Sequence, residues 1–159
     1  MFNQWVLFAL VLGFLGACGF MFWPRWRRRQ REQWLARARE SFHFHREWLE
    51  AHFLTLAERS GKPRGLRWMD CEFEDDVAFA RDKSSGNLRA LVGVTIRFEA
   101  IEGGGMEDVE AVDNLKAGTV VFRLDGPSWE ADSRPLFNLN PAETIEHYRH
   151  ELETVDKAS

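Results

Sequence analysis

The chain has 159 residues, of which 45% are hydrophobic, 29% charged and 13% aromatic, and its formal net charge is −4. This length has room for one globular domain, and the aromatic and aliphatic content excludes a disordered or fibrous chain. The two cysteines, Cys18 and Cys71, are too few for a disulfide framework and form no CxxC pair, which argues against cysteine-type structural zinc.

Charge is distributed in three blocks along the chain. Residues 1–24 have no ionisable side chain, residues 24–39 contain seven arginines and one acid, and residues 40–159 contain fourteen basic and twenty-four acidic residues. The blocks therefore carry charges of 0, +6 and −10. This pattern indicates an apolar segment, a basic collar and an acidic body, and the acidic body argues against binding of nucleic acid.

The apolar block predicts a transmembrane anchor over residues 1–24. The nineteen residues Trp5–Trp23 carry no charge and as a helix would cover about 28 Å, close to the hydrocarbon thickness of a bilayer. A tryptophan stands at each end, where its ring favours the headgroup level. Pro24 is expected to end or kink the helix at the interface.

The arginines after the span predict its orientation. Because the positive-inside rule keeps basic residues in the cytoplasm, we expect a single-pass protein of the cell's inner membrane, with the N-terminus outside and the C-terminal domain cytoplasmic. The main role expected of the collar is topology, and contact with anionic headgroups is compatible with it. The collar consists of Arg25, Arg27, Arg28, Arg29 and Arg31.

A different interpretation of the first segment stays open. The letters LGAC at 15–18 resemble a bacterial lipobox, which would make the protein an envelope lipoprotein lipidated at Cys18. The apolar run continues for five residues beyond Cys18 and arginines follow it, so we favour the spanning helix. A cleaved signal peptide fits less well, because no charged side chain precedes the apolar run.

A second helical pattern covers about residues 25–59. Its first part, residues 25–41, is expected to form a basic juxtamembrane stalk, and the soluble α+β domain is expected over residues 42–159. Gly61 and Pro63 form a stop signal for this helix. Its apolar stripe comprises Trp34, Ala38, Phe42, His45, Leu49, Phe53 and Leu56, widened by Leu35 and Trp48.

Alternating apolar residues then predict a four-stranded antiparallel meander. Pairing Asp82 with Asn87 across the first turn places Phe79 opposite Ala90 and Phe73 opposite Ile96 on one face. On the other face Glu72 lies opposite Arg97, so these two residues are a candidate cross-strand pair. In the second hairpin Phe122 is expected opposite Ala131, and Pro135 indicates an edge strand or a bend. The predicted strands are Leu66–Arg81, Leu88–Glu102, 117–124 and Trp129–Leu139.

The last predicted element is a helix that begins after Asn140. Asn at the N-cap, Pro141 at the first helical position and Glu143 two residues later are three agreeing start signals. Its apolar stripe would comprise Ile145, Tyr148, Leu152 and Val155.

Asp75 is the candidate pocket acid. Strict alternation places it on the apolar face of the first strand, between Phe73 and Val77. Three interpretations remain: a β-bulge resets the alternation there, an arginine pairs with an inward carboxylate, or the carboxylate works in a pocket. No histidine spacing matches a metal motif, and no cofactor is expected.

The order helix, four strands, helix over residues 42–155 resembles the cystatin-like and NTF2-like roll. The stretches GGGMEDVEAV (103–112) and FNLNPAE (137–143) also resemble uncharacterised bacterial single-span membrane proteins. These resemblances imply an α+β roll behind one membrane span, and they imply no functional residues.

These features favour a membrane-anchored, cytosol-facing module whose sheet or acidic surface binds another protein. The alternatives are an NTF2-like ligand-binding or enzymatic domain with Asp75 in its hollow, and the envelope lipoprotein. Because Trp34, Phe42, Trp48 and Phe53 offer a large aromatic volume on the long helix, we expect the sheet to be packed shut against it. An enzymatic role is therefore less favoured.

Overall fold

The computed structural model describes residues 2–60, 66–105 and 115–155, and it describes side chains from Arg25 onward. Its contacts divide the chain into two compact units, residues 1–41 and 42–159, and each is considered by itself. The helix α1 runs from Phe2 to Ser60. Of the two effects expected of Pro24, an end of the helix is wrong, because α1 continues through this residue. A proline inside a helix removes one backbone hydrogen bond without preventing the next turn.

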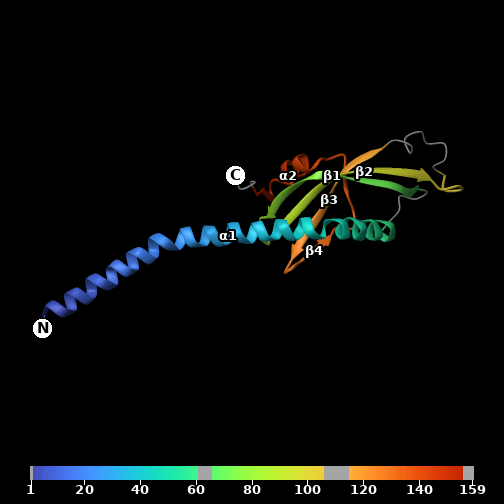
Figure 1. The fold of residues 1–159 in the computed structure, drawn as a ribbon. Helices are drawn as coiled ribbons and strands as arrows, with labels where there is room; N and C mark the ends of the chain where they lie inside the picture. Colours follow the sequence, from blue (N-terminus) through green and yellow to red (C-terminus); the bar gives the residue numbers. More distant parts are fainter. Residues whose placement is uncertain (1, 61–65, 106–114, 156–159) are drawn as a thin grey trace. The chain divides into compact units, whose positions relative to one another are not determined.

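The second unit is an open antiparallel sheet flanked by helices (Figure 1). The strand order is β4-β3-β2-β1-β6, and β5 pairs with β3 beside this path. This is the expected α+β class, and the described residues form six strands rather than the four expected. The elements after α1 are β1 (Leu66–Asp82), β2 (Leu88–Ala100), β3 (Lys116–Asp125), β4 (Ser128–Ala131), β5 (Leu136–Phe137), α2 (Pro141–His147) and β6 (Leu152–Thr154).

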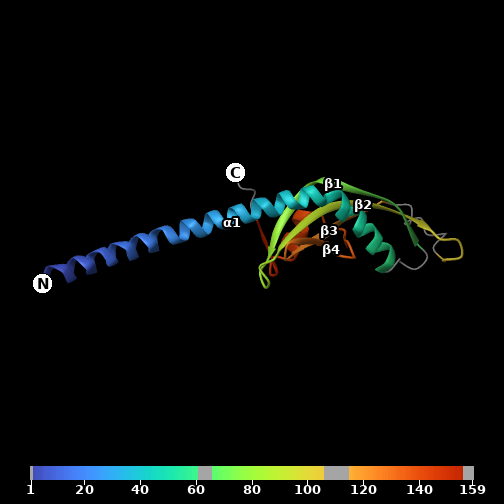
Figure 2. The ribbon, with the colours of Figure 1, turned by 60° about the horizontal axis from the view of Figure 1, so that its bottom comes forward.

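One face of the sheet is covered by the last part of α1, residues 42–60 (Figure 2). Phe42 is fully buried, and its ring centroid lies 5.0 Å from that of Trp129 and 5.4 Å from that of Phe122. One end of this layer is closed by Phe53, whose ring lies 6.0 Å from Phe73. The buried aromatic rings thus fill the space between helix and sheet, as expected for Phe42 and Phe53.

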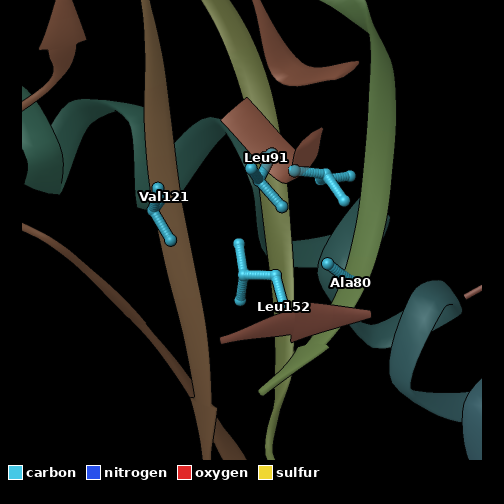
Figure 3. Close-up of a cluster of buried hydrophobic side chains, with 5 residues drawn as sticks. Ala80, Leu91, Val121 and Leu152 are labelled. Carbon is cyan, nitrogen blue, oxygen red and sulfur yellow. The ribbon is translucent and has the colours of Figure 1, made fainter. Parts of the chain in front are cut away.

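The opposite face carries a smaller core beneath α2 and β6 (Figure 3). Leu91 and Val121 come from neighbouring strands and alternate with the residues that face α1, so each central strand is buried on both sides. The buried members of this cluster are Ala80, Leu91, Val121, Ile145 and Leu152.

The register of the first hairpin is as expected near its turn and shifted further away. Phe79 pairs with Ala90 as predicted, but the ladder shifts between Phe73 and Val77 and again between Trp68 and Asp70. Phe73 consequently pairs with Val94 rather than with Ile96.

The expected Glu72–Arg97 pair is wrong. Arg97 lies opposite Asp70, and Glu72 lies opposite Thr95. The physical reason is the bulge in β1, where three residues oppose a single residue of β2 and the partners of residues 70–73 consequently move by two positions.

The fourth predicted strand is divided at Pro135. Phe122 pairs with Ala131 in β4 as predicted, whereas β5 pairs Leu136 with Thr119 after a shift in register. The chain bends in between, as expected for a proline that cannot donate to a sheet.

The last helix is shorter than predicted. Its start is confirmed, because the Asn140 side chain accepts a hydrogen bond from the Glu143 N–H at 2.8 Å and the Glu143 carboxylate accepts from the Asn140 N–H at 3.0 Å. Leu152 does not continue the helix, because β6 pairs with the edge of β1 instead, where Leu152 lies opposite Asp82. Leu152 is still buried, as its apolar character suggests, but it belongs to a strand and not to the helix.

The turn between β1 and β2 is organised by Asp82. One carboxylate oxygen accepts from the Ser84 hydroxyl at 2.6 Å and from the backbone N–H groups of Ser84 and Ser85, and the other accepts from Arg89. The hydrogen bond from the Ser84 hydroxyl, followed by those from the backbone of Ser85 and Ser84 and from Arg89, holds the pKa of Asp82 well below its usual range, although burial opposes this. Gly86 completes the turn at φ 75°, a conformation that glycine adopts without strain.

Candidate functional site

The bulge in β1 contains the candidate acid Asp75. Residues 74–76 loop out between the pairs Phe73–Val94 and Val77–Val92, and all three are exposed. The bulge interpretation is therefore confirmed, and Asp75 does not point into the layer between helix and sheet. Strict alternation fails for Asp75 because the bulge takes residues 74–76 out of the ladder, whereas Phe73 and Val77 on either side remain paired with Val94 and Val92.

An arginine does reach this segment, although it binds the backbone rather than a carboxylate. The guanidinium group of Arg46, on α1, donates to the carbonyl oxygen of Asp75 at 2.7 Å and to that of Glu74. Its Nε donates at 2.6 Å to Glu50 one helical turn later. Arg46 thus satisfies two carbonyls that the bulge withdraws from the β1–β2 ladder.

Gly93 lies opposite the bulge and leaves room for Glu74. A Cβ at position 93 would lie 2.1 Å from a carboxylate oxygen of Glu74, so the missing side chain allows that carboxylate to lie over β2. The bulge is therefore supported from two sides, by Arg46 at its carbonyls and by Gly93 beneath the Glu74 side chain. This arrangement is a structural brace between α1 and the sheet.

Cys71 lies near the brace but is not a reactive thiol. Burial, followed by the negative charges of Asp70 and Glu50, raises its pKa to about 12. Because the thiolate is the nucleophilic form, Cys71 stays protonated at neutral pH and does not support nucleophilic chemistry.

Replacing Arg46 with Met is expected to destabilise the second unit by about 1.5–3 kcal/mol, because the hydrophobic stem is kept while hydrogen bonds from a charged group are lost. Asp75→Asn is the matched control in the same bulge, and it should change the free energy of unfolding by less than about 0.5 kcal/mol because the side chain is exposed. Urea unfolding followed by circular dichroism measures both. Equal effects of the two substitutions would contradict the brace.

A second feature lies on α1, on the side opposite its buried stripe. Phe44 is 84% exposed and Trp48 is 61% exposed, one helical turn apart. The ring of His52, another turn along, stacks on Trp48 with centroids 5.1 Å apart and planes 4° from parallel. We refer to Phe44, Trp48 and His52 as the outer aromatic face.

The sequence prediction placed Trp48 in the buried stripe, and this is wrong. Trp48 is exposed, and so are Trp34 and His45, whereas Phe42, Leu49 and Phe53 are buried. The positions of these residues around the helix could have predicted their exposure. At about 100° per residue, Phe44 lies about 200° from Phe42 and Trp48 about 240° from it. Two aromatic residues so far from the buried stripe identify a second apolar face.

The remaining predicted residues take no part in either feature. The side chains of the collar arginines, Arg25, Arg27, Arg28, Arg29 and Arg31, are exposed on the first unit. Glu72 is exposed on β1. Within the part of the chain that the structure describes, no three histidine, cysteine or acidic side chains gather closely enough to hold a metal ion.

The N-terminal prediction falls on residues whose side chains are not described. From Arg25 onward, over the described ranges, no helix is long and apolar enough to cross a membrane. The predicted anchor, residues 1–24 with Cys18, lies outside those ranges.

The fold and the two features define an α+β chain with an open antiparallel sheet, a long N-terminal helix and an outer aromatic face. No family model, curated protein or solved structure matches this chain.

Proposed function

We propose that the protein is a membrane-anchored module that binds another protein chain through the outer aromatic face of α1. The observation that carries the proposal is the exposure of Phe44 and Trp48 side by side on one helix. Aromatic residues that are rigid and exposed are the side chains that most often anchor protein interfaces, since they bury a large area at a small entropic cost. This proposal moves the binding surface from the sheet or the acidic surface, where the sequence suggested it, to the helix.

The alternative function, a ligand-binding or enzymatic domain, is not supported at the residue on which it depended. It required Asp75 in a hollow between helix and sheet, whereas Asp75 is exposed on the bulge and the Arg46 guanidinium binds its backbone. The long helix packed along an open antiparallel sheet remains compatible with a cystatin-like or NTF2-like roll. In such a roll, Phe42 and Phe53 would occupy the volume that a ligand needs.

The anchor and its orientation form the second part of the proposal. Residues 1–24 contain no ionisable side chain, and five arginines follow within seven residues, from 25 to 31. We propose that this segment spans the inner membrane with the N-terminus outside, so that the sheet and the aromatic face lie in the cytoplasm. Lipidation at Cys18 is the competing arrangement.

The orientation is tested with reporter fusions to the full chain at Ser159. A fluorescent protein should be bright and alkaline phosphatase inactive, because the collar arginines keep this end in the cytoplasm. Replacing the five collar arginines with glutamine should produce mixed orientations. Active phosphatase on the unaltered chain would overturn the proposed orientation and favour the lipoprotein.

The binding surface is tested by photo-crosslinking in intact cells. A benzophenone amino acid in place of Phe44 should give a discrete protein adduct, because this side chain is exposed on the proposed interface. The same amino acid at Ser128, an exposed position in β4, is the matched control and should give none. A chain that forms no protein adduct from position 44 would contradict a protein-binding role for this face.

A further inference from the structure

We propose that the partner of the outer aromatic face is a second copy of this chain, docked as a parallel pair of α1 helices. This inference rests on the proposed function and names the occupant of the same surface. Three features support it: the spacing of the face, the polar side chains beside it and the orientation that a shared membrane imposes.

The first feature is a seam with the spacing of a two-helix interface. Phe44, Trp48, Ala51 and Thr55 follow one another at intervals of four, three and four residues, and all four are exposed and uncharged. This is the alternation by which a helix presents one stripe to an identical partner. Because Phe44 lies about 200° around the helix from the buried Phe42, a second helix can occupy the seam without displacing the sheet.

The second feature is hydrogen-bonding complementarity across such a pair, because an imidazole N–H can donate to a carboxylate. Glu47 and His52 are exposed, flank the seam on opposite sides and are five residues apart. In a parallel pair, positions with this relationship face one another between the helices, so the Glu47 carboxylate of one copy meets the His52 imidazole of the other, twice by symmetry. An antiparallel pair would not bring them together, because each flank would then face the same flank of the partner.

The third feature is orientation. Two copies anchored in one membrane with the same topology present their α1 helices in the same direction. The seam contains two large aromatic residues per chain, which is a small area for a stable dimer in solution. Anchoring raises the effective concentration of one copy near the other, so that a weak contact can be occupied at the membrane.

The test uses disulfide crosslinking of the full chain in phosphatidylcholine–phosphatidylglycerol liposomes, in a background with Cys18→Ala and Cys71→Ala. Thr55→Cys places a thiol in the seam, where its counterpart in a parallel pair comes within bonding distance. His43→Cys is exposed on the same helix but away from the seam, and it serves as the control. With mild oxidation, we expect position 55 to form dimers at least about tenfold faster than position 43.

Two sets of variants test the contacts themselves. Phe44→Ser with Trp48→Ser should reduce crosslinking at position 55 to the rate at position 43. Glu47→Lys should also reduce it, because an ammonium group cannot accept a hydrogen bond from His52. Adding His52→Glu should restore it, because a carboxylate at position 52 then faces the ammonium group at position 47 of the other copy. Restored crosslinking would require contact between the two copies, because a helix that folds correctly without pairing would not respond to the second substitution.

The outcomes separate this inference from the proposed function. Equal crosslinking at positions 55 and 43, or no restoration by His52→Glu, would overturn the parallel pair. If the benzophenone at position 44 then still labels a different protein, the binding role stands with another partner. If it labels none, both proposals fall.

Discussion

Phe42→Ala is expected to destabilise the second unit by about 3–5 kcal/mol, the largest effect of any single substitution considered for this protein. Phe42 is fully buried, and its ring makes edge contacts with Phe79, Phe122 and Trp129 at centroid distances of 5.9, 5.4 and 5.0 Å. Removing the ring leaves a cavity where helix and sheet meet, and the surrounding strands cannot collapse into it without breaking their ladder.

The matched control is Phe44→Ala, two residues along the same helix. Phe44 is 84% exposed, so the same truncation should change the free energy of unfolding by less than about 0.5 kcal/mol. Urea unfolding of both full-length variants in detergent, followed by far-ultraviolet circular dichroism, measures the difference. Comparable losses for the two variants would show that α1 does not present the face described here.

Asp82→Asn is expected to cost about 3 kcal/mol at pH 7, because the amide cannot balance Arg89 or accept all the hydrogen bonds of the carboxylate. The same substitution should change the pH dependence of stability. The pKa of Asp82 in the folded chain lies below that in the unfolded chain, which is about 3.9. Its stabilising contribution is therefore complete above about pH 5 and is lost as the pH falls below about 4 towards the native pKa.

Unfolding by urea between pH 7 and pH 3 measures this effect. The unaltered chain should lose stability more steeply below pH 5 than Asp82→Asn, so that the two curves converge at low pH. Asp125→Asn is the control, since Asp125 is exposed at the end of β3. Parallel curves for the unaltered chain and Asp82→Asn would contradict the role of the ionised carboxylate.

The two hairpins were predictable because their signals are local. The turn at 82–87 and the alternating strands beside it give the pair Phe79–Ala90, and Pro135 marks the bend between β4 and β5. The start of α2 was equally clear, because the N-cap, the proline and the capping glutamate lie within four residues, 140–143. Such signals depend only on residues that are close together in the sequence, so they can be recognised without the structure.

The bulge in β1 and the position of the candidate site could not be predicted from local signals, because they depend on contacts between distant parts of the chain. A bulge at 74–76 is favourable here because Arg46, twenty-nine residues from Asp75, binds its carbonyl oxygen, and Gly93 accommodates Glu74. Alternation along β1 alone contains neither partner, so it predicted the wrong residue opposite Arg97. Because this bulge exposes Asp75, the candidate site is no longer Asp75 but the outer aromatic face of α1.

The sequence by itself determined the α+β class, the hairpin turns, the division of charge and an amphipathic helix before the sheet. Only the tertiary structure decided which apolar residues of that helix are inside, since Phe42 and Trp48 have similar hydrophobic character and differ in the direction they face. It also decided that Leu152 lies in a strand, because the open edge of β1 offers backbone partners that an isolated segment lacks. Local chemistry specifies turns and caps, whereas the burial of a face and the pairing of an edge depend on surfaces contributed by distant parts of the chain.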